Sequence, residues 1–265
     1  MIALLVFRNI LWGFTTVCCF TGHVNEVSGT NIFARVNAGR EYLVYEMTFT
    51  SDEDTAMILP IPVAYGATED AVEFVALDDY PDFFRDLAAH FQGVWSNAKL
   101  LGSTGPKVAL RVERVGAFEA SFVPSINLLN QLDPRFRIPQ QVWNQLPAYA
   151  SFGFVVFKLR LGKSVNVHPM AFSFRTRDPS TLFFPTVHVH DGTVHEEAVF
   201  DHIFYTQNEP KRSRSWPTEF WMPGNGVASG HLSIRRAHGL VDGNAPCFQA
   251  SLVGASKNSD ILVQI

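Results

Sequence analysis

The residues most able to carry chemistry are histidines in the stretch 185–197, which reads Pro-Thr-Val-His-Val-His-Asp-Gly-Thr-Val-His-Glu-Glu. Asp191-Gly192 lies there between two runs of alternating apolar and polar residues. This dipeptide favours a two-residue β-hairpin, because both central residues of a type I′ turn need a positive φ. Counting outward from the turn pairs His188 with His195. The sequence therefore predicts a hairpin that carries histidines.

Three of these histidines would share one face of the sheet. Residues two apart on a strand, and residues paired across strands, point to the same side, so His188, His190 and His195 should converge. Their spacing fits the ligand triangle of a catalytic zinc, which keeps a fourth position open for water. His202, beside Asp201, is a candidate fourth ligand or a group that supports the ligands. This local pattern is similar to the zinc-binding strands of the α-type carbonic anhydrases, which implies hydrolysis or hydration by metal-bound water.

Glu196 and Glu197 follow the third histidine directly. They are the candidate proton acceptors for a zinc-bound water. A second interpretation needs no metal, since a half-solvated antiparallel hairpin also carries valines on its buried face and polar residues on its wet face. The stretch therefore predicts either a zinc site or an ordinary exposed sheet face.

Cys18 and Cys19 form another candidate site. If processing made either cysteine the N-terminus, its α-amine could act as the base for the thiol, as in an N-terminal cysteine amidohydrolase. Without processing, the pair is an ordinary couple of buried thiols. The chain has only three cysteines. That number is too small for a disulfide framework, which favours a reducing, cytoplasmic compartment.

The charge distribution bears on possible partners. A net charge of −4 gives no electrostatic footprint for nucleic acid. Ten carboxylates between Asp52 and Asp86 form an acidic stretch that lacks the spacing of a calcium loop. This 52–86 stretch is the candidate surface for a competing function, a non-enzymatic β-sandwich that binds a small molecule or a protein.

A mainly β fold is expected to position these residues. Short runs of β-branched and aromatic residues, separated by Gly, Pro and Asp, predict strands and turns from residue 31 onward. A helix is expected over 81–92, and shorter ones over 125–132 and 140–146. We expect one antiparallel, β-sandwich-like domain with a few short helices. The predicted strands are Ile32–Val36, Tyr42–Thr50, Ala56–Pro60, Val72–Leu77, Val108–Val115, Phe118–Val123, Phe152–Leu161, Val167–Arg175, Phe183–His190, Val194–Glu197 and His202–Thr206.

Three stretches divide the chain. Residues 1–17 form an apolar extension or a buried first element. This stretch lacks the basic start of an export signal, so secretion is only the alternative to a cytoplasmic location, and it is short for a membrane span. Residues 18–208 form the β-rich domain. Residues 209–265 begin as a linker with basic residues and continue as a loosely organised portion packed on the same domain.

Several short stretches together resemble a family of uncharacterised, mostly bacterial proteins. The resemblance covers about residues 18–265, and it implies no activity, cofactor or partner. The residues that carry it are Cys18-Cys19-Phe20, Ile32-Phe-Ala-Arg35, Ala56-Met-Ile-Leu-Pro-Ile-Pro62, Tyr80-Pro-Asp-Phe-Phe84, Phe118-Glu-Ala-Ser-Phe-Val-Pro124, Val167-His-Pro-Met-Ala-Phe172 and Leu182-Phe-Phe-Pro-Thr-Val-His-Val-His-Asp-Gly192.

Overall fold

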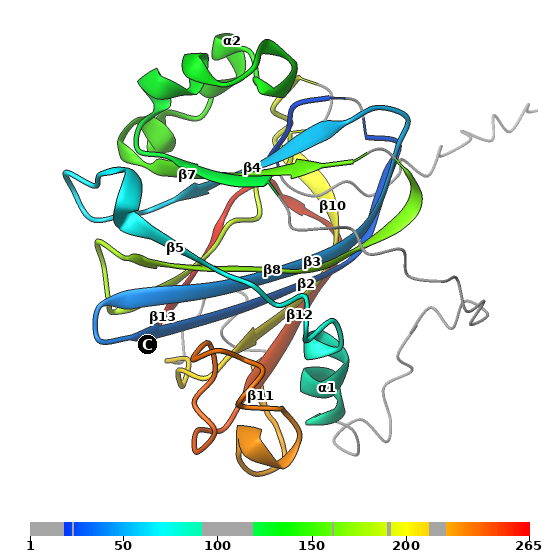
Figure 1. Cartoon of the computed structure of the whole chain (residues 1–265), viewed down its shortest axis with the longest axis vertical. Coiled ribbons are helices and arrows are strands. Elements are labelled where there is room, and N and C mark those ends of the chain that lie inside the picture. Colours follow the sequence, from blue (N-terminus) through cyan, green and yellow to red (C-terminus); the bar gives the residue numbers. More distant parts are fainter. Residues whose placement is uncertain (1–18, 23, 92–118, 161, 190–191, 212–220) are drawn as a thin grey trace, which may run out of the picture.

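The computed structural model describes residues 19–22, 24–91, 119–160, 162–189, 192–211 and 221–265, and for residues 162–168 only the backbone. The described chain is mainly β, with largely antiparallel sheets and a few short helices, which confirms the predicted fold class. Figure 1 shows two sheets facing one another, with helices on the outer sides of both. Within the described ranges, no helix is long and apolar enough to cross a membrane.

The larger sheet has seven strands, and a long hairpin lies in its middle. β2 (Glu26–Asn37) and β3 (Arg40–Ser51) are joined by Ala38 and Gly39, whose φ angles are 49° and 76°. Two positive φ angles in a row are those of a type I′ turn, whose twist matches that of paired strands. The described neighbours pair antiparallel, except β2 with β10, which are parallel. The strand order is β11 (Met222–Pro223), β12 (Phe248–Lys257), β10 (Glu197–Thr206), β2, β3, β8 (Gly162–Arg175) and β5 (Val72–Val75).

The smaller sheet has four strands and faces the first across the main core. Its order is β1 (Cys19–Phe20), β4 (Thr55–Ile61), β7 (Gly153–Leu159) and β6 (Glu119–Val123). A separate antiparallel pair is formed by β9 (Thr181–Phe184) and β13 (Ile261–Gln264). The core contains many aromatic side chains, such as Phe49, Phe157 and Phe172. Removing such large apolar surfaces from water is the main stabilising contribution to this layer.

Helices cover the outer side of each sheet (Figure 1). α1 (Phe83–Ala89) lies against the seven-stranded sheet, where Phe83, Phe84 and Leu87 pack in one cluster with Tyr205 of β10. A second cluster joins the four-stranded sheet to the short helices above it. These are η2 (Ile126–Gln131), η3 (Pro134–Phe136), α2 (Gln140–Trp143) and η4 (Pro147–Ser151), while η1 (Glu69–Ala71) and η6 (Ala228–Gly230) are single turns elsewhere.

Most of the predicted elements are present. The strands predicted between residues 32 and 77 fall on β2 to β5, those between 118 and 175 fall on β6 to β8, and the helix predicted over 81–92 contains α1. The predicted strand Val108–Val115 and the extension 1–17 lie outside the described residues. Loose organisation was expected after residue 209, but β12 pairs along its whole length with β10, and β13 pairs with β9.

Candidate functional site

The two arms of the predicted histidine hairpin lie close together, but they are not paired strands. β9 ends at Phe184 and β10 begins at Glu197, so residues 185–188 and 192–196 belong to neither strand. Gly192 has a φ of 76°, which is consistent with a tight turn at that point. The prediction that His188 pairs with His195 in a regular ladder is nevertheless wrong.

The side chain of Asn258 holds the two arms in place of a ladder. Its Oδ1 accepts a 2.7 Å hydrogen bond from the backbone N–H of His188. Its Nδ2 donates to the backbone oxygens of both His188 and His195, each at 3.0 Å. The first arm also bonds to β1, because the N–H of Phe20 donates to the oxygen of Val189 at 2.8 Å. These contacts satisfy backbone groups that strand pairing would otherwise have satisfied.

His188 lies in the interior and not on a wet sheet face. Its exposed fraction is 3%, and Val187 and Val189 on either side of it are buried too. The imidazole packs on Phe200, with ring centroids 4.4 Å apart, and lies 5.5 Å from the ring of His202. The arm is therefore covered on both sides, which the alternation of valine and histidine did not reveal.

His202 is fully buried in β10, in the same row of side chains as Phe200 and Phe204. Burial lowers the pKa of His202 well below its usual value, so the ring is neutral. The backbone N–H of Asp201 donates to Nδ1 at 3.3 Å, which places the ring proton on Nε2. A zinc ion at Nε2 would need a lone pair there. The carboxylate of Asp201 binds elsewhere, accepting a 2.6 Å bond from the N–H of Gly29.

The other described members of the predicted site differ from this interior pair in their exposure. His195, Glu196 and Glu197 are exposed, whereas His188 and His202 are buried. His190 lies outside the described residues. Among the residues that are described, no three His, Cys, Asp or Glu side chains are grouped so that they could hold a metal ion. The structure thus brings His188 and His202 together. The four-histidine ligand set as a whole stays a prediction.

Cys19 is 1% exposed, in the four-stranded sheet. Its Sγ donates to the backbone oxygen of Val187 at 3.8 Å. Cys18, its neighbour in the proposed N-terminal nucleophile, lies outside the described residues. A thiol enclosed in this way is packed as a small apolar group.

The acidic stretch 52–86 follows three separate elements. Its carboxylates lie at the turn between β3 and β4, around η1 and β5, and around α1. Part of this charge is neutralised locally, because Arg85 contacts Asp82 at 2.6 Å and Arg40 contacts Glu73 at 3.6 Å. Exposed ion pairs of this kind contribute little to stability.

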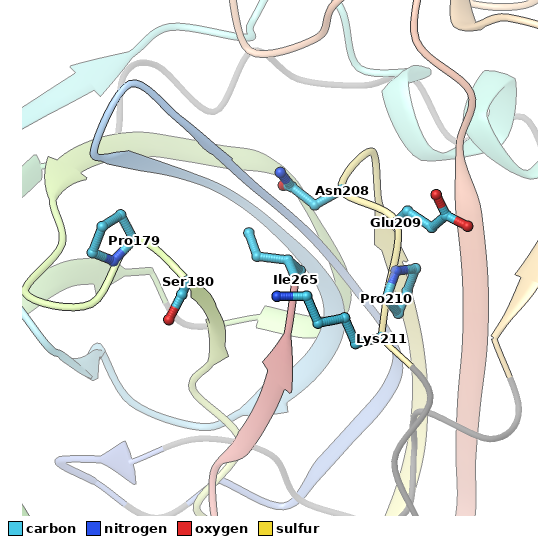
Figure 2. A pocket seen from close by; sticks show the side chains of 7 residues that line it. All are labelled: Pro179, Ser180, Asn208, Glu209, Pro210, Lys211 and Ile265. Atoms are coloured by element: carbon cyan, nitrogen blue, oxygen red, sulfur yellow. The ribbon is translucent and has the colours of Figure 1, made fainter.

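Among the described residues, two cavities are lined by no histidine. An open pocket of about 730 Å³ lies beside the end of β13, and Figure 2 shows the side chains that line it. A smaller groove of about 270 Å³ opens between β5 and the edge of the four-stranded sheet, lined by Phe74, Phe157 and Met170 among others. The residues that line the larger pocket are Pro179, Ser180, Asn208, Glu209, Pro210, Lys211 and Ile265.

The sequence interpretation missed a partly buried aspartate in the turn between β12 and β13. Asp260 accepts hydrogen bonds from the hydroxyl of Tyr149 at 2.6 Å and from the N–H groups of Thr186 and Val187 at 2.8 and 3.2 Å. Burial raises its pKa to about 6, against these three contacts, which lower it. The sequence shows only the turn-forming run Asn-Ser-Asp at 258–260, and such a run does not indicate which residues the carboxylate of Asp260 contacts.

No family model and no curated protein matches the chain. Among solved structures, baculovirus P35 gives a TM-score of 0.53 at 12% identity, over 93% of this chain and 99% of P35. P35 in its complex with caspase-8 gives 0.48 at 10% identity, over 89% and 96% of the two chains. A mutated P35 after caspase cleavage gives 0.45 at 11% identity, over 89% and 99%. At these identities the first likeness shows a shared fold. The resemblance to uncharacterised bacterial proteins stays a prediction.

Proposed function

We propose that this chain is a non-enzymatic binding protein that recognises a protein partner. The observation that carries the proposal is the likeness to P35 along nearly the whole of both chains. P35 has been solved in a complex with caspase-8, so at least one protein with this arrangement of strands binds another protein. The step from fold to binding is an analogy, because one fold can support unrelated functions.

The placement of the reactive side chains supports a binding function over catalysis. His188 and His202 pack against phenylalanine rings, and the thiol of Cys19 is enclosed in a sheet. Catalytic groups need access to substrate and a partner that tunes their protonation. These three side chains instead fill the interior, as apolar residues would.

Caspase-8 is the first probe to use, because it is the partner named for P35. The experiment immobilises the full chain and measures binding of active caspase-8 by interferometry, with P35 as the positive control and heat-denatured chain as the negative one. Saturable binding by the folded chain alone is the expected result. A hydrolytic activity of this chain that is lost on chelation of metal would contradict a non-enzymatic function.

A zinc centre is the competing proposal, and the contact between His188 and His202 favours it. The two imidazoles, with ring centroids 5.5 Å apart, could belong to one centre if the ring proton of His202 moved off Nε2 and His190 or His195 joined them. Elemental analysis of protein purified without an affinity tag tests this. About one zinc per chain, lost in His188→Ala and kept in a control such as His238→Ala, would support the zinc centre. Absence of stoichiometric zinc would refute it.

A further inference from the structure

The smaller of the two cavities opens between the edges of the two sheets. Among the described strands, β5 is the last of the seven-stranded sheet and β6 is the last of the four-stranded sheet. Residues of both edges line this groove, together with Phe157 of β7 and residues 169–171 of β8. Phe157 and Met170 belong to the main core. The groove therefore leads from the surface to the layer between the sheets.

The walls of the groove are apolar, and one of them is an exposed phenylalanine. Phe74 of β5 is 39% exposed. Its ring lies edge-on to the ring of Phe157, with centroids 5.9 Å apart, and its centroid is 6.4 Å from that of Phe172 in β8. Phe157 and Phe172 are themselves buried. A ligand in the groove would cover apolar surface that the fold leaves in contact with water, which is a favourable contribution to binding.

The charge at the groove has one sign. Among the described residues that line it, Asp78 is the one charged side chain, and it is exposed. The nearby ion pair of Glu119 and Lys158, at 2.8 Å, belongs to the other face of the four-stranded sheet, because Lys158 lies over the ring of Phe136 in the helical layer. Asp78 is also part of the acidic stretch 52–86, where ten carboxylates accompany one base. The groove thus favours a cation over an anion.

The volume of the groove limits the size of its ligand. It is about 270 Å³, whereas drug-sized ligands occupy sites of roughly 300–1,000 Å³. At about 30 Å³ for each water-sized group, the groove holds about nine non-hydrogen atoms. That is the size of a short alkyl chain, or of one aromatic ring with a short side arm, that carries a single polar group.

We propose that this groove binds a small amphipathic amine, with its apolar part against Phe74 and Phe157 and its ammonium group beside Asp78. The walls favour burial of the hydrocarbon. The carboxylate attracts the ammonium group and repels a carboxylate ligand of the same size. An ammonium group that reached the exposed ring of Phe74 would gain a further attraction from the quadrupole of that ring. This site goes beyond the proposed recognition of a protein partner and does not depend on it.

The first test compares three probes that share an alkyl chain and differ in charge: octylamine, octanol and octanoate. Each is titrated into the full chain, labelled with ¹⁵N, at pH 7 and low salt, and the amide chemical shifts report both the place and the affinity of binding. Octylamine should shift the amides of residues 74–78 and 120. It should bind about fivefold more tightly than octanol, as expected for one exposed ion pair, and octanoate should bind least. Added salt should reduce the difference between the probes.

The second test uses variants of the groove. Asp78→Asn removes the charge and keeps the size of the side chain, so octylamine and octanol should bind this variant equally. Ala120→Leu fills part of the groove from β6. It should weaken octylamine and octanol at least about tenfold, which corresponds to lost burial of about two methylene groups. Ser121→Leu is the matched control, because Ser121 is exposed and the next residue along a strand points to the opposite face.

Three outcomes would overturn this proposal. The first is the absence of octylamine-dependent shifts at residues 74–78 and 120. The second is an affinity for octylamine that is the same in Ala120→Leu as in Ser121→Leu. The third is a natural chain that binds octanoate or octanol as tightly as octylamine, which would mean that Asp78 does not select a cation. Caspase-8 binding is measured separately, so the proposed recognition of a protein partner is decided by its own assay.

Discussion

Asp260 gives the structure a pH dependence whose sign can be worked out. Burial raises its pKa from an ordinary value of 3.8 to about 6. The folded state therefore binds this proton more tightly than the unfolded state. The protonated carboxyl makes its full contribution to the free energy of unfolding only below about pH 4. That stability is lost as the pH rises through about 6. Two pKa units at 1.36 kcal/mol each correspond to about 3 kcal/mol of unfolding free energy.

Asp260→Asn isolates this effect because an amide does not titrate. Its oxygen can still accept from the N–H groups of Thr186 and Val187, and its amide can donate to the hydroxyl of Tyr149. Urea unfolding followed by tryptophan fluorescence, between pH 4 and 7.5, gives the free energy of both proteins. The natural chain should lose about 2.5 kcal/mol relative to the variant across this range.

Tyr149→Phe provides a control on the same carboxylate. The hydroxyl of Tyr149 lowers the pKa of Asp260, so its removal should move the loss of stability to a higher pH. If the three hydrogen bonds outweighed burial, the pKa would lie below 3.8 and the natural chain would gain stability over Asp260→Asn as the pH rises. That opposite slope, or parallel curves, would refute the reasoning.

Three further predictions concern the arms, the core and the thiols. Asn258→Asp should cost about 2 kcal/mol in urea unfolding at pH 7, because a carboxylate cannot donate to the two histidine oxygens at 3.0 Å; an unchanged midpoint would contradict the role of this side chain. Gly153→Ala should lower the free energy of unfolding by about 1–3 kcal/mol, because the added Cβ would lie 2.5 Å from the ring of Phe122. Thermal unfolding measures this, and an unchanged melting temperature would contradict it. Cys19 and Cys247 are buried, so neither should react with a thiol reagent until the protein is denatured, as peptide mapping of the label can check.

The fold class could be predicted from sequence because most strands carry strong local signals. In the run Tyr42–Thr50, for example, buried residues mostly alternate with less buried ones, and the buried positions hold large apolar or aromatic side chains such as Met47 and Phe49. β12 was missed because its sequence, Phe-Gln-Ala-Ser-Leu-Val-Gly-Ala-Ser-Lys, consists mainly of small residues with low strand propensity. Its pairing with β10 supplies the order that the local sequence does not. The parallel contact between β2 and β10 joins segments far apart in the chain, and no local pattern reports it.

The histidine site was harder to predict, because alternation along a strand shows which residues share a side but not which side faces water. Both sides of the segment that carries His188 are covered. The imidazole packs against Phe200 and His202 on one side, and Val187 and Val189 pack into the core under the short helices on the other. The next strand contained a better signal. Phe200, His202 and Phe204 recur at every second position of β10, so His202 belongs to an apolar row and should be buried. His202 is accordingly neutral and packed in this row, and His188, whose ring stacks near it, is buried as well.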